Sequence, residues 1–304
     1  MRYAFWTVDV FTDRSFGGNP LAVIPYANGL TVEQMQRIAR EFNLSETSFV
    51  LPAESAEHTF RLRIFTPQRE LPFAGHPTLG AAYVLGLCGR VELKTERTQV
   101  IFGESVGAVP VEIRAAGTQP VFTQLTAAML PQFGPPAPPS EIVAAMLSVD
   151  PSDVLDDVHD EPMAISCGMP FLFVPLASRD AVRRSRLNWE WYNQYVAAAW
   201  APQIYVFSFD AEASDASIHA RAFTRAVGIE EDPATGSAAC GLAGYLARRE
   251  QLKDGTARWR VEQGVEMGRP SMLDVEADTR DGAITAVRVG GSSVVVSEGH
   301  LFVP

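Results

Sequence analysis

Two segments of this chain, about 160 residues apart, repeat the same pattern of residues. Each begins with the motif R-x-F-T, at residues 63–66 and again at 221–224. A polar loop follows, then a tight turn before Gly75 or Gly236, and then a stretch rich in Ala, Gly and Leu that is typical of a buried helix. A strand, a loop and a helix repeated in this order restrict the chain to folds that contain two copies of one unit.

The repeat extends towards the N-terminus of each copy. Residues 18–24 (GNPLAVI) are echoed by residues 168–174 (GMPFLFV). Each echo precedes a predicted amphipathic helix and then an apolar strand, at 31–41 and 47–51 in the first copy and at 189–199 and 204–209 in the second. At a period this long, the pattern predicts two homologous domains and not a solenoid.

The length of 304 residues agrees with roughly two domains. We expect the first domain to cover residues 1–118, completed by a C-terminal strand at 293–304, and the second to cover residues 119–292. The proline-rich segment 131–139 cannot donate a regular ladder of hydrogen bonds, so we expect an exposed loop there.

The net charge of the chain limits the classes of partner that it can bind. Lys and Arg total 25 against 36 Asp and Glu, a formal net charge of −11. Nucleic acids and anionic membrane surfaces both require a basic footprint, so we expect neither as a partner.

The N-terminus lacks the features of a secretory signal, no apolar run reaches the ~18 residues of a membrane span, and the three cysteines are few and scattered. These features predict a cytoplasmic protein with free thiols.

The two predicted helix starts, at Gly75 and Gly236, are candidates for binding an anion. A helix N-terminus offers unpaired N–H groups and a partial positive charge, so it can hold a carboxylate without a basic side chain. Two such ends facing each other across a cleft between the halves would accept a small acid. The alternative is that both glycines serve packing alone, but a matched pair favours the functional interpretation.

Glu46 is the candidate for proton transfer. It lies between a predicted helix and an apolar strand, and its counterpart in the second copy falls near Gln203, which cannot carry a proton. A carboxyl group in a partly apolar site has a raised pKa, which suits it to take and return a proton. The alternative for Glu46 is a helix-capping or surface residue, and its position in the sequence does not separate the two.

Asp232 and His76 are further candidates. Asp232 is the last of three consecutive acids, of which one or two suit the first turn of the following helix. Because a proline follows it, its backbone is biased towards an extended conformation. His76 is the one histidine of five whose neighbours suggest a site. No spacing of ligands indicates a metal, and no glycine-rich phosphate motif is present, so we expect neither a metal nor a cofactor.

The cysteines decide between two mechanisms. A cofactor-free racemase built from two such domains would carry one thiol at each facing helix start. Those places hold His76 and Ser237, while Cys88, Cys167 and Cys240 lie elsewhere. Thiol-pair chemistry is therefore disfavoured, and the three cysteines are better interpreted as small buried apolar residues.

Several long motifs in fixed order resemble the phenazine-biosynthesis (PhzF-like) isomerase family, which shares the diaminopimelate epimerase-like fold. The resemblance runs essentially end to end and is carried by FT at 11–12, GNPLAV at 18–23, NLSET at 43–47, PFAGHPT at 72–78 and EDPATGSA at 231–238. It implies an α+β fold of two homologous, pseudo-symmetric domains. Each is a curved, mostly antiparallel sheet wrapped around a central helix, and the active site lies in the cleft between them.

The resemblance also implies roles for residues. Glu46 corresponds to the family's acid/base, and His76 and Asp232 are the other catalytic candidates. The expected substrate-binding residues are Asn19, Gly75, His76, Gly236 and Ser237.

The family's studied reaction isomerises trans-2,3-dihydro-3-hydroxyanthranilate by moving a proton without a cofactor, and its members are typically homodimers. The motifs do not specify the substrate, however. A cofactor-free racemase or epimerase of an amino or hydroxy acid therefore remains an alternative, as does a non-catalytic protein that binds small molecules.

Overall fold

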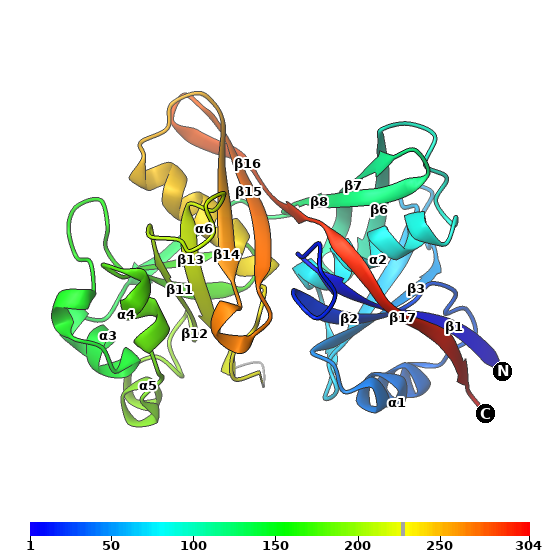
Figure 1. Cartoon of the computed structure of the whole chain (residues 1–304), viewed down its shortest axis with the longest axis horizontal. Helices are drawn as coiled ribbons and strands as arrows, with labels where there is room; N and C mark the ends of the chain where they lie inside the picture. The colour runs from blue at the N-terminus through cyan, green and yellow to red at the C-terminus, as the bar shows by residue number, and fades with distance from the viewer. Residues whose placement is uncertain (226–228) are drawn as a thin grey trace. The chain divides into compact units, whose positions relative to one another are not determined.

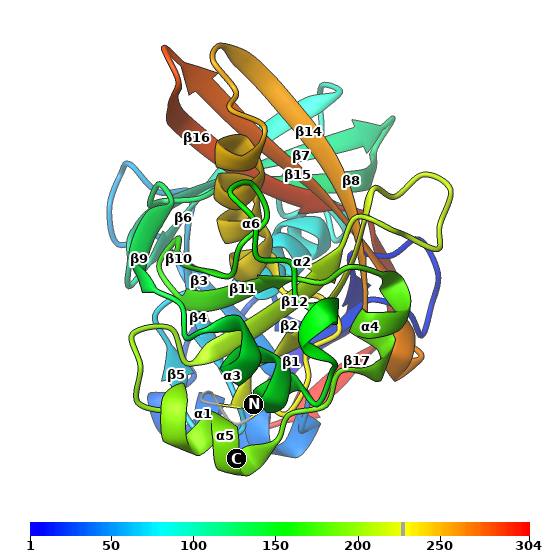
Figure 2. The same ribbon diagram turned by 90° about the vertical axis from the view of Figure 1, so that its left-hand side faces the viewer.

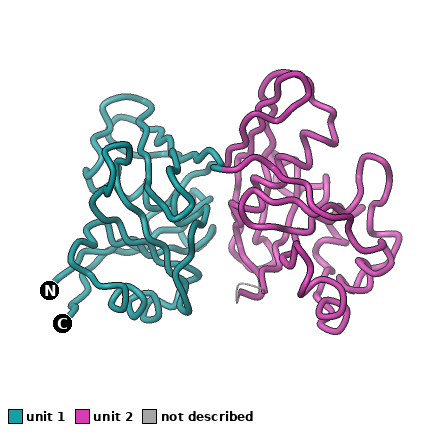
Figure 3. Tube along the Cα trace, turned by 180° about the vertical axis from the view of Figure 1, so that it is seen from behind, with its two compact units in different colours: residues 1–128, 290–304 teal, residues 129–289 magenta. Residues whose placement is uncertain are grey.

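The computed structural model describes residues 1–225 and 229–304, and the chain divides into two compact units (Figure 3). Unit 1 comprises Met1–Ala128 and Gly290–Pro304, and unit 2 comprises Met129–Val289. The first boundary lies ten residues beyond the one expected from the repeat. The reason is that β8 (Gln119–Thr126) pairs antiparallel with β7 (Gly107–Ala116), and so stays in unit 1 instead of beginning unit 2.

Unit 1 wraps its strands around one buried helix, α2 (Gly75–Leu87) (Figure 1). Every residue of α2 from Gly75 to Gly86 is buried, and the helix packs against β1, β2, β3, β7 and β8. A helix that is apolar on all sides is stable only in such a position. The other elements of unit 1 are β1 (Arg2–Val10), β2 (Asn19–Ile24), α1 (Val32–Phe42), β3 (Glu46–Pro52), β4 (Phe60–Phe65), β5 (Glu70–Leu71), β6 (Arg97–Glu104) and β17 (Ser293–Phe302).

The sheet of unit 1 is mostly antiparallel. The pairs β1–β2, β1–β17, β3–β4, β6–β7 and β7–β8 run antiparallel, while β2–β3 and β4–β6 run parallel. The predicted C-terminal strand is confirmed, because β17 crosses back to unit 1 and pairs with β1 along its whole length.

Unit 2 repeats this plan around α6 (Gly236–Arg249), which packs against β10, β11, β14 and β15 (Figure 2). None of the helices in the described part of the chain is long and apolar enough to cross a membrane. The other elements of unit 2 are β9 (Gln132–Pro136), α3 (Ser140–Leu147), η1 (Pro151–Asp153), β10 (Met163–Ser166), β11 (Pro170–Pro175), α4 (Arg179–Arg184), α5 (Trp189–Tyr195), β12 (Gln203–Ser208), β13 (Ile218–Phe223), β14 (Gly255–Gln263), η3 (Val265–Met267), β15 (Ser271–Arg280) and β16 (Ala283–Gly291).

The arginine of each R-x-F-T motif makes the same contacts in its own unit. Arg63 on β4 donates two hydrogen bonds of 2.6 Å to the carboxylate of Glu70. Arg221 on β13 donates two of 2.8 Å to Glu231. Each guanidinium also lies over the ring of the phenylalanine two residues further along, at 5.2 Å and 5.0 Å from the centroid. These matching contacts agree with the α+β fold of two similar units expected from the sequence, which is confirmed.

Two local expectations were wrong. The proline-rich segment is not a loop throughout, because residues Gln132–Pro136 form β9 and pair with β10 across an irregular register. Proline is tolerated there because a strand paired on one side needs fewer N–H donors. The predicted helix 189–199 is also shorter, and α5 ends at Tyr195.

Candidate functional site

Glu46 is the first residue of β3 and has an equivalent in unit 2. β2 and β3 pair in parallel with Leu21 opposite Glu46, and β11 and β12 pair in parallel with Phe171 opposite Gln203. Because the two GxP motifs align Leu21 with Phe171, Glu46 and Gln203 occupy equivalent places. Of these two places, only the one in unit 1 carries an ionisable group.

Glu46 lies beside His76 in the interior of unit 1. Its Oε2 atom is 3.3 Å from His76 Nε2, and the two residues are only 7% and 5% exposed. Burial lowers the pKa of His76 to about 3, so the ring is neutral at pH 7. The contact is therefore between a carboxyl group and a neutral imidazole, and not an ion pair. Glu46 is a buried group and not a surface carboxylate.

The local fold fixes this pair. His76 is the second residue of α2, which begins at Gly75 after the extended N-cap residue Ala74. The Ser48 hydroxyl on β3 donates a 3.2 Å hydrogen bond to the carbonyl of Pro77, and so ties the strand of Glu46 to the first turn of α2. Both partners of the pair thus sit on elements bound directly to each other.

Asn19 lies at the start of the neighbouring strand. It is the first residue of β2, fully buried, and pairs with Val10 of β1. The preceding Gly18 has φ +60°, and a Cβ there would lie 2.3 Å from the Val10 carbonyl oxygen, so no other residue fits. Asn19 precedes Leu21, the strand neighbour of Glu46, by two residues.

In unit 2, Asp232 takes a place that is apolar in unit 1. Ala222 forms an isolated bridge with Asp232, and Ile64 pairs with Leu71 in the equivalent position. Asp232 is only 8% exposed. An acid in the place of a leucine is a second difference between the halves.

Asp232 belongs to a directed hydrogen-bond network. Its Oδ2 atom accepts a 2.6 Å hydrogen bond from the Thr235 hydroxyl. The Gln263 amide donates to the Thr235 oxygen at 2.9 Å and to the Asp232 backbone carbonyl at 2.7 Å. The Gln263 carbonyl oxygen in turn accepts from the hydroxyl of Tyr205. Because the Thr235 oxygen accepts a hydrogen bond from the Gln263 amide, Thr235 donates its single hydroxyl proton to Asp232.

The start of α6 supplies the remaining predicted residues. Gly236 is its first residue, as Gly75 is of α2, so Ser237 takes the place of His76. Gly236 is buried and Ser237 half-buried. The predicted site residues therefore form two groups, one in each unit, and the prediction that they act together stays a prediction.

The cysteines are poorly placed for chemistry. Cys167 and Cys240 are buried, and burial raises the pKa of Cys167 to about 12 and that of Cys240 in the same direction. Cys88 is the C-cap residue of α2. A thiol with a raised pKa is a weak nucleophile and base at neutral pH. In the part of the chain that the structure describes, no three His, Cys, Asp or Glu residues cluster as metal ligands would.

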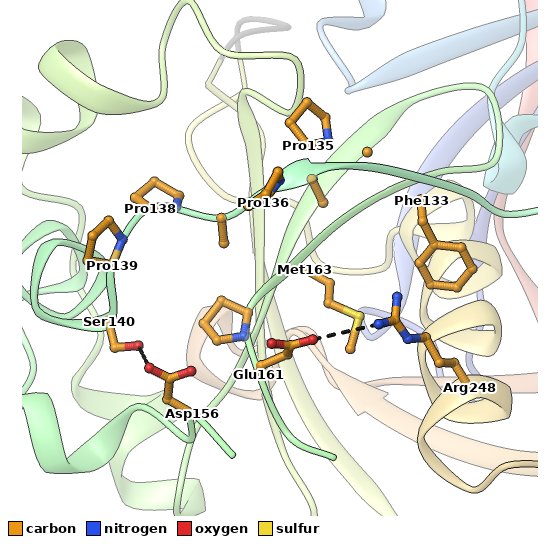
Figure 4. Close-up of a pocket in the computed structure, with 14 residues that line it drawn as sticks. Phe133, Pro135, Pro136, Pro138, Pro139, Ser140, Asp156, Glu161, Met163 and Arg248 are labelled. Atoms are coloured by element: carbon orange, nitrogen blue, oxygen red, sulfur yellow. Dashed lines mark hydrogen bonds and ion pairs between the residues drawn. The ribbon is translucent and has the colours of Figure 1, made fainter. Parts of the chain in front are cut away.

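A cavity of about 400 Å³ lies elsewhere in unit 2, beside β9 (Figure 4). Among the side chains that line it, Arg248 lies 3.8 Å from Glu161, and the Ser140 hydroxyl bonds to Asp156. None of the predicted site residues lines this cavity. This cavity is therefore not part of the candidate site.

Three polar residues beside the two groups did not emerge from the sequence: Thr235, Gln263 and Glu104. Thr235 is part of the second turn motif, yet nothing marks its hydroxyl as a donor to Asp232. Gln263 and Glu104 each end a strand, and only the pairing of those strands reveals that both side chains reach a helix start.

Comparison with known proteins places the chain in one family. The family model for phenazine biosynthesis-like proteins (PhzC-PhzF) matches residues 8–299. An uncharacterized isomerase of Mesorhizobium japonicum is 37% identical, with 97% of each chain covered. The trans-2,3-dihydro-3-hydroxyanthranilate isomerase of Pseudomonas aeruginosa is 34% identical, with 99% of each chain covered. The crystal structure of the Bacillus anthracis phenazine biosynthesis protein of the PhzF family superimposes with a TM-score of 0.88 at 28% identity, covering 100% of both chains. The chain belongs to the phenazine biosynthesis-like (PhzC-PhzF) family.

Proposed function

We propose that this protein is a cofactor-independent isomerase that moves a proton on a small carboxylic acid, with Glu46 as the acid and base. The observation that carries the proposal is the buried contact between Glu46 and His76, at a place whose equivalent in unit 2 holds Gln203. The relatives named as isomerases support the reaction class.

In the proposed reaction, the Glu46 carboxylate removes a proton from a carbon of the substrate. The electron pair of that C–H bond shifts through an adjacent double bond, and the protonated Glu46 returns the proton to another carbon. Atoms and charge balance without any other reactant. General acid–base catalysis of this kind contributes about 10²–10⁴-fold in rate.

His76 assists as a neutral group. Because burial keeps its pKa near 3, its ring carries no charge at pH 7 and can hydrogen-bond to Glu46 in either protonation state of that carboxyl group. A charged imidazolium beside Glu46 would instead stabilise the carboxylate and make it a weaker base. The neutral ring leaves Glu46 able to take up a proton and release it.

The helix starts are proposed to hold the substrate. The N–H groups at the beginning of α2 and α6 suit a carboxylate. Asp232, fixed by Thr235, is proposed to accept a hydrogen bond from an amino or hydroxyl group of the same substrate, and Ser237 to donate one. Asp232→Asn and Ser237→Ala should therefore raise KM more than Glu46→Gln does.

The experiment is a screen of small carboxylic acids in deuterated solvent, beginning with trans-2,3-dihydro-3-hydroxyanthranilate, the compound named for the Pseudomonas relatives. Mass spectrometry and NMR of the recovered acid report whether deuterium enters, and at which carbon. Deuterium at a new position with a shifted double bond supports allylic isomerisation. Deuterium with inversion at the original carbon indicates an epimerase. An acid that raises the unfolding temperature but exchanges no hydrogen indicates a non-catalytic binder.

The family resemblance also leads us to propose a homodimer. Size-exclusion chromatography with light scattering measures the mass directly. Twice the chain mass of 33.1 kDa supports the proposal, and the mass of one chain contradicts it.

A further inference from the structure

The strand that ends in Gln263 has an equivalent in unit 1, and that strand ends in a carboxyl group. β13 and β14 pair in parallel, with Ala220 opposite Gln263. β4 and β6 pair in parallel in the same way, with Arg61 opposite Gly103. The R-x-F-T motifs align β4 with β13, so the residue after Gly103, Glu104, takes the place of Gln263. Each is the last residue of its strand.

Both side chains reach the start of the central helix in their own unit. Gln263 bonds to Thr235, the N-cap residue of α6. The N-cap residue of α2 is Ala74, which has no side-chain oxygen, and the Thr78 hydroxyl lies 2.8 Å from its carbonyl oxygen instead. Glu104 Oε1 lies 2.7 Å from the same Thr78 hydroxyl. Glu104 is thus linked through one hydroxyl group to the residue that precedes Gly75.

The single proton of the Thr78 hydroxyl group indicates the protonation state of Glu104. The Thr78 hydroxyl has one proton and two oxygen neighbours within 2.8 Å. A carboxylate leaves the two contacts to share the one Thr78 proton, whereas a protonated Glu104 can donate to Thr78 and so allow each contact its own hydrogen bond. The other oxygen, Oε2, is buried and has no hydrogen-bond partner in the part of the chain that the structure describes. A buried oxygen without a partner is far less costly in a neutral acid than in a carboxylate.

The surroundings agree with a neutral acid. Burial raises the pKa of Glu104 to about 8, and the Thr78 contact offsets this only in part. Nearby titratable groups do not compensate: the His58 ring lies against Gly103 on the same strand, and Arg61 on the paired strand is bound to Glu54. None of these charges is a cause of the shift in Glu104.

We infer that Glu104 is a positioning residue, which as a neutral carboxylic acid holds the first turn of α2 and, through that turn, the ring of His76 beside Glu46. The inference rests on the proposed function only for its effect on turnover, because the effect on His76 exists without a substrate. In unit 2 the amide of Gln263 makes the equivalent contact at every pH.

Ionisation of Glu104 changes the turn. A carboxylate cannot donate, so Thr78 must give its proton to Glu104 and withdraw it from the Ala74 carbonyl, next to Gly75 and His76. Because the pKa of Glu104 in the folded chain lies above the usual 4.5, its stabilising contribution is complete below pH 4.5 and is lost as the pH rises through 8. His76 itself, with a pKa near 3, does not titrate in this range.

The test is a pH titration of the histidine ring nitrogens by NMR, using the full chain labelled with ¹⁵N-histidine. Single His→Gln variants assign the five ring signals. In the wild type we expect the His76 signal to move with a midpoint near pH 8. Glu104→Gln, which has the shape of the neutral acid and can donate to Thr78, should hold His76 at its low-pH position up to pH 10. Thr78→Val should also remove the step, because it removes the link.

Two controls separate this effect from others. Glu112→Gln changes a glutamate on the neighbouring strand β7, whose partner is Arg114, and should leave the His76 step in place. The ring of His219 in unit 2 should titrate alike in all these variants. A step that persists in Glu104→Gln, or no step in the wild type between pH 6 and 10, overturns the inference.

Turnover is measured separately. If the proposed function holds, the alkaline limb of the proton-exchange rate, with its midpoint near pH 8, should disappear in Glu104→Gln while the rate at pH 6.5 stays within about threefold. If no acid exchanges hydrogen, the proposed function fails, and the NMR titration still decides the role of Glu104.

Discussion

At the scale of the residue, the two units differ at three equivalent places in and around the candidate site. Glu46, His76 and Leu71 in unit 1 correspond to Gln203, Ser237 and Asp232 in unit 2. The backbone around these places is repeated, so the differences lie in the side chains. Unit 1 holds a buried glutamate beside a neutral histidine, and unit 2 holds a buried aspartate that accepts a hydrogen bond from a hydroxyl group. The two units thus share one backbone plan and carry different ionisable side chains on it.

Unit 2 contains a second buried cluster of ionisable groups, formed by His219, Glu262 and Glu266, which stabilises the fold of this unit. His219 is fully buried, with one ring nitrogen 2.6 Å from Glu262 and the other 2.8 Å from Glu266. Burial opposes a charge on the ring, but the two hydrogen bonds outweigh it and raise the pKa of His219 to about 9. The ring is therefore an imidazolium at pH 7, unlike the neutral His76.

This cluster predicts a pH dependence of stability. Because the folded pKa of His219 exceeds its usual 6.5, its contribution is complete below pH 6.5 and is lost as the pH rises through 9. His219→Gln should lower the free energy of unfolding by on the order of 2 kcal/mol at pH 6, and by clearly less at pH 9.5. Denaturant unfolding at both pH values measures the difference. A loss that is the same at both would contradict a charged His219.

At the scale of the element, the central helices depend on glycine at matching positions. Gly80 in α2 and Gly241 in α6 each lie five residues after the first glycine of the helix. A Cβ at Gly80 would lie 2.5 Å from Leu21 Cδ2, and one at Gly241 would lie 2.6 Å from Phe173 Cζ. Both helices therefore approach their sheets more closely than alanine allows.

Gly80→Ala and Gly241→Ala should each destabilise the chain. Overpacking costs about 1–3 kcal/mol, and the gain in helix propensity, up to about 1 kcal/mol, offsets only part of it. Gly86→Ala on α2 is the control, because its nearest neighbour, Leu93 Cδ1, is 3.2 Å away and can yield. Thermal unfolding of the three variants measures the effect. If Gly80→Ala unfolds at the same temperature as Gly86→Ala, α2 does not pack against β2 as closely as the distance at Gly80 indicates.

The elements also show what the sequence could predict. The order of the repeated helices and strands and both helix starts followed from the repeat, because each rests on a local pattern present twice, whereas β17 was predicted from its own sequence. The sequence did not predict β9 or the early end of α5. The residues of β9 pair with β10 despite their proline content, and α5 ends at Tyr195, before the end of the predicted helix.

The candidate site was predictable only where a motif carried it. Glu46, His76 and Asp232 lie in motifs, whereas Glu104 and Gln263 lie at strand ends outside them. Only the strand register, with Arg61 opposite Gly103 and Ala220 opposite Gln263, shows that Glu104 and Gln263 are equivalent. Hydrogen-bond direction, which fixes Thr235 and Thr78, is a property of the folded chain alone.

At the scale of the whole molecule, the chain begins and ends in the same unit. β17 is the outer partner of β1 over nine paired positions and joins the last residues of the chain to the first. Unit 1 is therefore built from two separate segments of the chain, whereas unit 2 is continuous in sequence.

Removal of residues 293–304 should loosen unit 1 selectively. Amide hydrogen exchange measured by mass spectrometry should show lost protection in β1 and α2, with α6 protected as in the wild type. The reason is that β1 loses the hydrogen bonds of one full edge, while none of the strands in contact with α6 is removed. Unchanged protection of β1 would show that β17 is dispensable to unit 1.

The most direct test of the central claim compares two exchanges between a carboxyl group and an amide of the same shape. On the acid that incorporates deuterium fastest, Glu46→Gln should lower the rate about 10²–10⁴-fold, while Gln203→Glu, the equivalent place in unit 2, should not restore it in the double variant. The unfolding temperature and the ligand-induced shift show whether each variant still folds and binds. A Glu46→Gln protein that folds, binds and exchanges hydrogen at the wild-type rate would contradict the account.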